Sequence, residues 1–143
     1  MVDKAQIKDI LRQILQEELQ KTNVKKISLA SVLMNESDRL ETGDPKDRVY
    51  THDILTLQES PEMGCGIMEM ERTTFPWTLT YDEIDYVIEG TLQILMDETV
   101  VTAGPGELIF IPKGSNIRFS VKEHARFLYI TAPADWKNQK ETG

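Results

Sequence analysis

Histidine and cysteine are scarce in this sequence, and their scarcity limits the chemistry that it can perform. Its 143 residues include two histidines, His52 and His124, and one cysteine, Cys65. A single cysteine cannot form a disulfide within the chain, so we expect a reduced, cytoplasmic protein in which Cys65 is a small buried side chain. Two histidines cannot build an imidazole-rich iron or copper centre, since these metals favour imidazole ligands. We expect His124 to be exposed in a charged turn, and His52 to lie at the surface or to be hydrogen-bonded.

Basic residues and long apolar runs are also scarce. Sixteen Lys and Arg stand against 24 Asp and Glu, which gives a net charge of −8. Nucleic-acid backbones and anionic membrane surfaces both require a basic face, so we expect neither as a partner. No uninterrupted aliphatic or aromatic run exceeds four residues, whereas a membrane span needs about 20. Charged residues interrupt the apolar ones throughout residues 1–19, which is not the pattern of a secretory signal.

Residues 3–20 predict an amphipathic helix. Their aliphatic side chains recur at the i, i+3, i+4 and i+7 spacing that places them on one face. Asp3 can cap the first turn, and Gln6 can complete a capping box three residues later. The apolar stripe consists of Ile7, Ile10, Leu11, Ile14, Leu15 and Leu19. We therefore divide the chain into a helix, residues 1–22, and a second domain, residues 23–143.

Beyond the helix, apolar residues alternate with polar ones, which predicts β-strands. Short turns separate the strands, among them Glu89–Gly90 and Gly104–Gly106. Since strands do not alternate with further helices, we expect an all-β domain of roughly ten strands folded as a sandwich or barrel. A polar loop is expected over 35–48, and strands are expected over 26–33, 49–57, 64–73, 77–90, 91–96, 100–103, 107–112, 116–121 and 125–132.

The order of strand, Glu89–Gly90 turn, hairpin and the segment GPGELIFIPKGS resembles the cupin superfamily, whose fold is a double-sheet jelly-roll barrel. In the cupin pattern three histidines and a glutamate hold a metal ion. The glutamate position is Glu83 here, and the histidine positions hold Trp77, Leu79 and Ile117. The usual iron, copper or zinc site is therefore not expected. The resemblance implies an all-β cupin-type barrel preceded by one N-terminal amphipathic helix.

Strand alternation assigns the side chains of the stretch WTLTYDEIDYVIEG to two faces. The face on which the cupin pattern places its first two histidines should line the cup, the interior cavity of the barrel. If no bulge interrupts the strand, this face carries Trp77, Leu79, Tyr81, Glu83, Asp85 and Glu89. The other face carries Asp82, Ile84, Tyr86 and Ile88. Crowded carboxylates in a poorly solvated cup repel one another, which raises a pKa unless a cation intervenes. The cation could be Mg²⁺ or Ca²⁺, or the charge could be met by Arg118 or Arg126.

Both alternatives stay open, and the metal remains unknown. We name Tyr81, Glu83 and Asp85 as candidate catalytic residues. The candidate ligand contacts are Trp77, Lys113 and Arg126.

A narrower resemblance covers about residues 40–138. The strings FPWTLTYDEIDYVIEGTL, AGPGE, FIPKGS and RFLY, followed by Pro133 and Trp136, resemble the EutQ family of ethanolamine-utilisation proteins. The resemblance implies a cytoplasmic protein of ethanolamine breakdown, associated with a bacterial microcompartment. It also implies acetate kinase activity, the ATP-linked interconversion of acetate and acetyl phosphate.

Three functional classes stay open. A phosphotransferase could hold Mg²⁺ with Glu83 and Asp85 and could meet phosphate with Lys113, Arg118 or Arg126, although the sequence has no G-x-x-x-x-G-K-[ST] loop. A non-catalytic protein could bind a small ligand in the cup or take part in assembly. A metal-dependent cupin enzyme could use carboxylates as its ligands.

A homodimer is expected, and a microcompartment protein is a second possible partner. Edge strands need covering, and the strands over 26–33 or 49–57 could pair across chains, so we expect a homodimer. The apolar stripe of residues 3–20 must be covered as well. It could pack on its own barrel or its dimer mate, or it could dock to a microcompartment shell or core protein.

Overall fold

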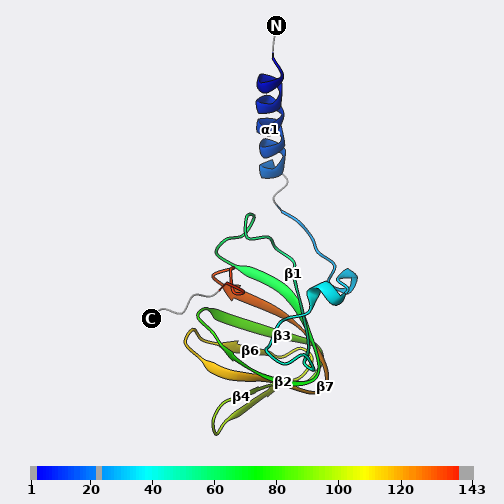
Figure 1. Cartoon of the computed structure of the whole chain (residues 1–143), viewed down its shortest axis with the longest axis vertical. Helices are drawn as coiled ribbons and strands as arrows, with labels where there is room; N and C mark the ends of the chain where they lie inside the picture. The colour runs from blue at the N-terminus through cyan, green and yellow to red at the C-terminus, as the bar shows by residue number, and fades with distance from the viewer. Residues whose placement is uncertain (1–2, 22–23, 139–143) are drawn as a thin grey trace. The chain divides into compact units, whose positions relative to one another are not determined.

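A computed structural model describes residues 3–21 and 24–138, without the side chains of 17–21 (Figure 1). The chain divides into two compact units, one ending at Ser31 and the other beginning at Val32. The first contains helix α1 (Lys4–Lys21) and the 3₁₀-helix η1 (Leu29–Ser31). The second contains the 3₁₀-helix η2 and the seven strands found among the described residues. Their bounds are η2 (Glu36–Asp38), β1 (Arg48–Asp53), β2 (Gly64–Thr78), β3 (Asp82–Gly90), β4 (Leu92–Leu95), β5 (Val100–Ala103), β6 (Leu108–Ile111) and β7 (Asn116–Ala132).

Helix α1 begins with the capping box that its sequence predicts. The Gln6 backbone N–H donates to Asp3 Oδ1 at 2.8 Å, and the Asp3 N–H donates to Gln6 Oε1 at 3.1 Å. The described part of the apolar stripe is exposed, from 47% at Ile7 to 62% at Leu15. Leu19 lies outside the side chains that the structure describes. Within residues 3–21 and 24–138, no helix is both long enough and apolar enough to cross a membrane.

The strand predicted over 26–33 does not form, and this segment is irregular apart from η1. The Ser31 backbone N–H and hydroxyl both donate to the Ser28 carbonyl, at 3.1 and 2.7 Å. Such local bonds from serine offer the backbone an alternative to a sheet ladder. Helix η2 is also closed locally, by a capping box between Asn35 and Asp38. The sheet therefore begins only at β1.

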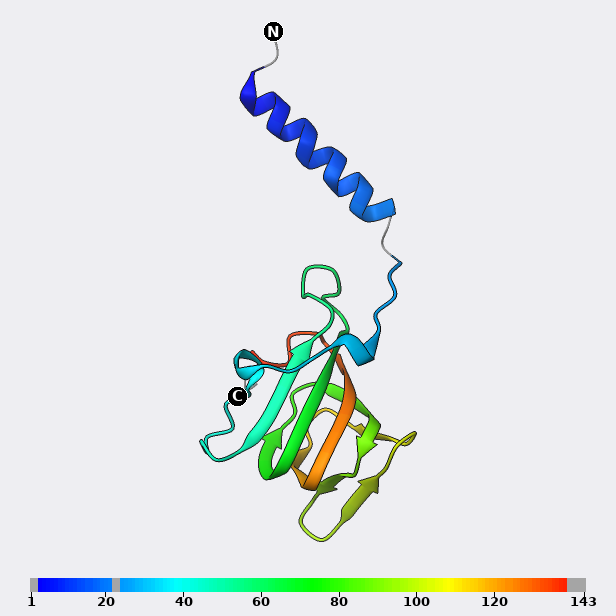
Figure 2. The same cartoon turned by 90° about the vertical axis from the view of Figure 1, so that its right-hand side faces the viewer.

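Strand β7 is the centre of the sheet, and its three neighbours run antiparallel to it (Figure 2). Strand β2 pairs with β7 along nearly its whole length, while β3 pairs with residues 125–132 and β4 with residues 118–120. Strand β1 adds to β2, β6 adds to β3 and β5 adds to β4. In Figure 2, β1, β2 and β7 lie side by side in turquoise, green and orange. The all-β prediction is confirmed.

Several predicted strand boundaries are wrong. The segments 116–121 and 125–132 form one strand, β7, and the strand predicted over 49–57 ends at Asp53. The strand predicted over 77–90 is interrupted at Leu79, whose N–H donates to the Ser115 carbonyl at 3.0 Å and whose carbonyl accepts from the Gly114 N–H at 2.8 Å. Its first residues belong to β2 and its last to β3. The described residues consequently hold seven strands rather than about ten.

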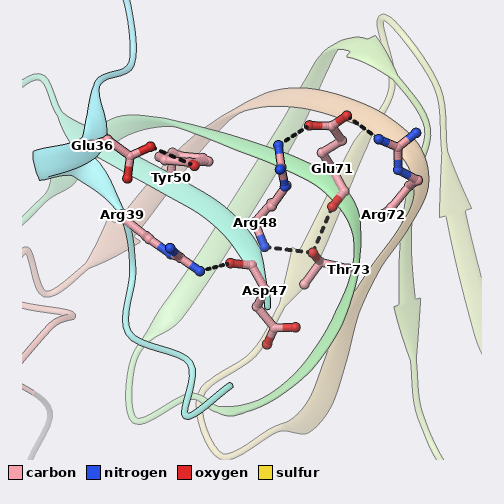
Figure 3. Close-up of polar contacts among 8 residues, drawn as sticks. All are labelled: Glu36, Arg39, Asp47, Arg48, Tyr50, Glu71, Arg72 and Thr73. Carbon is pink, nitrogen blue, oxygen red and sulfur yellow. Dashed lines mark hydrogen bonds and ion pairs between the residues drawn. The ribbon is translucent and has the colours of Figure 1, made fainter. Parts of the chain in front are cut away.

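A β-bulge interrupts β2 (Figure 3). The register against β7 shifts between Glu71 and Thr73, and Arg72 between them has a φ of +43°. The Thr73 hydroxyl donates to the Glu71 carbonyl at 2.8 Å and accepts from the Arg48 N–H at 2.9 Å. The guanidinium groups of Arg48 and Arg72 both contact the Glu71 carboxylate. Because a bulge bends and twists its strand, β2 can follow the curvature of the barrel up to Thr78.

The interior of the second unit is apolar and is filled from all seven strands. Phe75 stacks on Phe119 with ring centroids 5.4 Å apart, and Phe119 stacks on Phe127 at 6.4 Å. Full burial of one large apolar side chain stabilises a fold by about 1.5–3 kcal/mol. Among the described residues, Glu83 and Asp85 are the two ionisable acids buried in this interior. Core packing alone does not explain why acidic residues occupy these two positions.

Candidate functional site

Two neighbouring acids of β3 face the interior, as strand alternation predicts. Glu83 is 5% exposed and Asp85 is 0% exposed. Asp82 faces solvent, where its carboxylate accepts a hydrogen bond from the Lys113 backbone N–H at 2.7 Å. Glu89 does not lie on the cup face, because the uninterrupted alternation that this placement requires is absent. The register between β3 and β7 shifts after Val87, which turns Glu89 outward, and its carboxylate lies 3.9 Å from His124 Nε2.

A small pocket lies beside Glu83, and aromatic rings form much of its wall. Its volume is about 10 Å³, close to the room that one water molecule needs. Of the candidate residues, Trp77, Tyr81 and Glu83 meet in this pocket, whereas Asp85 is buried next to Glu83 without lining it. The complete lining is Leu40, Met68, Phe75, Trp77, Tyr81, Glu83, Phe119, Tyr129 and Trp136.

Tyr81 is oriented by Trp77, whose indole N–H donates to the Tyr81 hydroxyl at 2.8 Å. The hydroxyl accepts this bond and keeps its own proton for a second partner. Burial, and then the charge of Glu83, raise the pKa of Tyr81 well above its usual range. Tyr81 is therefore a neutral donor at physiological pH, suited to a carboxylate or phosphate oxygen in the pocket.

The two buried acids lack donors. Glu83 Oε2 and both carboxyl oxygens of Asp85 are buried without a hydrogen-bond partner among the described residues. A carboxylate that is buried in this way takes up a proton, because desolvation disfavours its charged form. Burial raises the pKa of Glu83 to about 7. Burial and the adjoining Glu83 carboxyl raise the pKa of Asp85 well above its usual range. The pair therefore holds at least one proton at neutral pH and can both donate and accept.

The cross-strand neighbour of Asp85 explains why no donor reaches it. Tyr129 lies opposite Asp85 on β7, yet its hydroxyl donates to Asp53 on β1. The ring passes over Gly66 of β2, where a Cβ would lie 2.1 Å from the Tyr129 hydroxyl oxygen. The Trp136 indole N–H donates to the same Asp53 oxygen at 3.1 Å. Asp53 thus fixes two aromatic walls of the pocket, and the hydroxyl of the residue opposite Asp85 is already committed.

The candidate cations do not line the pocket. Arg126 forms an ion pair with Glu69, and Arg118 is exposed, opposite Pro76 of β2. The unpartnered oxygens of Asp85 receive no hydrogen bond from either arginine. Lys113 is exposed in the turn that follows β6. A salt bridge to Arg118 or Arg126 therefore does not balance the charge of the two buried acids.

The residues present do not fit the metal of the usual cupin site. Leu79 and Ile117 are buried apolar side chains, 0% and 5% exposed, and Trp77 uses its N–H on Tyr81. Within the described ranges, no three His, Cys, Asp or Glu side chains lie close enough together to hold a metal ion. His52 is half-exposed, with Nδ1 3.0 Å from an Asp38 carboxylate oxygen.

Sequence reasoning missed Asp53, Tyr129, Thr131 and Trp136. Alternation within ARFLYITA puts Tyr129 and Thr131 on one face, but which face meets Glu83 depends on the pairing of strands more than 40 residues apart. Trp136 follows the last strand and carries no periodic signal. Cys65, expected to be buried, is only partly so, and burial raises the pKa of its thiol.

An antiparallel jelly-roll barrel with an inward-facing glutamate beside its cup defines a cupin-type domain. A cupin-2 domain protein from Shewanella frigidimarina has this fold, with a TM-score of 0.51 and 26% identity over 57% of this chain and 78% of that chain. The family model of ethanolamine utilisation protein EutQ matches residues 2–138, and the chain belongs to this family.

Relatives of known name agree with this assignment. The acetate kinase EutQ of Clostridioides difficile strain 630 is 53% identical over an alignment that covers 96% of this chain and 96% of that protein. The structure of Clostridium difficile EutQ matches with a TM-score of 0.82 and 60% identity, over 84% of this chain and 88% of that one. The acetate kinase EutQ of Salmonella typhimurium is 43% identical over 86 residues, 60% of this chain. That match spans 38% of the Salmonella protein, so this chain corresponds to a part of it.

Proposed function

We propose that this chain serves ethanolamine catabolism as an acetate kinase, with the cup as its acetate site. In this reaction an acetate oxygen attacks the γ-phosphorus of ATP. The new O–P bond forms as the bond from that phosphorus to the ADP oxygen breaks, giving acetyl phosphate and ADP. The proposal is supported by the name of the full-length C. difficile relative, acetate kinase EutQ.

One observation carries the assignment of the site: Glu83 is a buried acid that lines a pocket and has a pKa of about 7. Protonated Glu83 and the Tyr81 hydroxyl would donate to the two oxygens of an acetate carboxylate. Trp77 would hold Tyr81 in place. Because the pocket has room for about one water molecule, we expect wall side chains to move when acetate enters.

The triphosphate is too large and too highly charged for this pocket. We propose that ATP approaches from solvent as its Mg²⁺ complex, which supplies the cation that phosphoryl transfer needs. Lys113 is the candidate phosphate contact, since it is exposed in a turn whose backbone is tied to Asp82 on β3. Arg126 is engaged with Glu69 and has a structural role in this proposal.

The test is the trapping of acetyl phosphate as its hydroxamate after incubation with acetate, ATP and Mg²⁺. Glu83→Leu removes the donor at similar side-chain size, and we expect it to lower kcat/KM for acetate about 10²-fold, the usual effect of removing one preorganised donor. Glu98→Leu makes the same change at an exposed turn and should match the wild type. No product above the protein-free control would overturn the function, and an active Glu83→Leu variant would overturn the site.

A second candidate is a non-catalytic binding or assembly role within a bacterial microcompartment of the cytoplasm. The exposed apolar stripe of α1 favours it, because such a stripe requires a partner surface. Residues 3–20 would then dock to a shell or core protein. Co-purification of the intact chain with isolated microcompartments, and its loss in a chain that lacks residues 1–22, would support this role. Equal recovery of both chains would refute it.

A further inference from the structure

Four buried polar atoms that have no hydrogen-bond partner among the described residues lie in one layer of the barrel. They are Glu83 Oε2, Asp85 Oδ1, Asp85 Oδ2 and Thr131 Oγ1. Thr131 lies directly opposite Glu83 in the pairing of β3 with β7, and opposed residues in an antiparallel pair have Cβ atoms about 4.5–5.5 Å apart. Buried polar atoms are nearly always partnered. Two ionised carboxylates cannot hydrogen-bond to each other, because both only accept. If one of them takes up a proton, its O–H can donate to the other.

The two acids differ in their access to the pocket. Glu83 lines it and is 5% exposed, while Asp85 does not line it and is 0% exposed. We propose that Asp85 is held as a neutral carboxylic acid that donates a hydrogen bond to Glu83, so that Glu83 alone changes its charge at the cup. Asp85 is then a positioning residue rather than a catalytic one. This inference rests on the cup being the site of the proposed function.

Among the described residues, the groups that face the pair include no cation that could stabilise a second negative charge. Strand β3 contributes Tyr81, and β7 contributes Tyr129 and Thr131. Strand β6 places Ile109 and Ile111 opposite the acids. The facing positions of β2 are glycines: a Cβ at Gly64 would lie 2.4 Å from Thr131 Oγ1, and one at Gly66 would lie 2.1 Å from the Tyr129 hydroxyl. Asp53 of β1 stands behind Tyr129 and lies 3.5 Å from Lys137 Nζ, so that lysine is already paired.

The two tyrosines that face the pair, Tyr81 and Tyr129, stay neutral beside a charged Glu83. Burial raises the pKa of both Tyr81 and Tyr129 beyond their usual range, and the charge of Glu83 adds to the effect. Burial raises the pKa of Glu83, and the hydrogen bond with Asp85 opposes that rise, which leaves it at about 7. Glu83 thus donates to a ligand below neutral pH and accepts above it. Acetate should bind more weakly as the pH rises through this range.

The test is carbon-13 NMR of the ligand-free protein, labelled at the side-chain carboxyl of either Asp or Glu. At pH 9 we expect one Asp carboxyl carbon to keep the chemical shift of a neutral acid. That signal should be retained in Asp82→Asn and lost in Asp85→Asn. The absence of a neutral Asp signal at pH 9, or its survival in Asp85→Asn, would overturn the proposal. If Asp85→Asn does not fold, the wild-type Asp spectrum decides, since Asp85 is the buried Asp of the described residues.

A second measurement follows the Glu83 carboxyl carbon, assigned by its loss in Glu83→Gln. The Asn side chain of Asp85→Asn can still donate, so the titration midpoint of Glu83 should stay within one pH unit of the wild type. Asp85→Leu removes the donor, and the midpoint should rise. A fall of more than one unit in Asp85→Asn would mean that Asp85 carries a charge, which overturns the inference. Neither measurement requires turnover. The inference about Asp85 can therefore hold in a protein that has no kinase activity, and it can fail in one that is an active kinase.

Discussion

At the residue scale, Glu83 couples the stability of the fold to pH. Its pKa rises from 4.5 to about 7 because it is buried. Between these values the folded state keeps a proton that the unfolded state has released. The contribution of Glu83 to the free energy of unfolding therefore falls as the pH rises from about 4.5 to about 7 and is constant above that range. The sign is opposite to that of a salt-bridged carboxylate, and the size is roughly 3 kcal/mol.

Glu83→Gln should remove this pH dependence. Glutamine has the shape of neutral glutamic acid and cannot ionise, so we expect the variant and the wild type to be similar in stability at pH 5. At pH 8 the variant should be more stable by roughly 3 kcal/mol. Urea unfolding at both pH values measures the difference, and Asp82→Asn, at the exposed neighbouring position, should follow the wild type. A variant less stable than the wild type at pH 8 would mean that a cation stabilises the Glu83 carboxylate.

At the scale of elements, the sequence predicts the features that depend on interactions between residues close together in the chain. The capping box of α1 and the inward direction of Glu83 follow from spacing within a few residues. The segment 26–33 has a strand-like pattern, yet its backbone closes on itself through Ser28 and Ser31. The placement of Trp77 and Glu83 on different strands depends on contacts between Leu79 and the turn at Ser115, which no local pattern contains. The network of Asp53 with Tyr129 and Trp136 depends in the same way on distant pairing.

Removal of residues 1–31 should leave the second unit folded. Residues 32–143 form a compact unit with a core of their own, and Val32, whose carbonyl accepts from Arg126 at 2.9 Å, is retained. We expect the truncated chain to melt within about 4 °C of the full chain, which corresponds to less than about 1 kcal/mol for a domain of this size. Calorimetry of both chains gives the comparison. Aggregation, or a larger loss of melting temperature, would show that α1 is a packing element of the fold.

At the scale of the whole molecule, the outer face of β6 is exposed and apolar. Leu108 and Phe110 are 60% and 58% exposed, and Tyr86, opposite Leu108 on β3, is 41% exposed. Strand β6 also ends the order of the sheet. Another edge, β1, is partly covered, because the Leu40 N–H donates to the Val49 carbonyl at 2.8 Å. Of the two edges first expected to pair across chains, residues 26–33 form no strand, which moves the proposed dimer contact to β6.

A second copy of the chain is the partner that this face suits. Two chains of net charge −8 repel each other, and this repulsion is weakest when they meet through an uncharged face. In a dimer with a two-fold axis the same face of each chain forms the contact, so an apolar face can pack against its own copy. Sedimentation at micromolar concentration should therefore give twice the 16.4 kDa of one chain. The double variant Leu108→Lys with Phe110→Lys should sediment as a single folded chain, because four added charges would meet at the contact. The same change at Leu57 and Met63, exposed side chains of the segment between β1 and β2, should leave the dimer intact. A wild-type chain that sediments at 16.4 kDa, or a double lysine variant that stays dimeric, would exclude this interface.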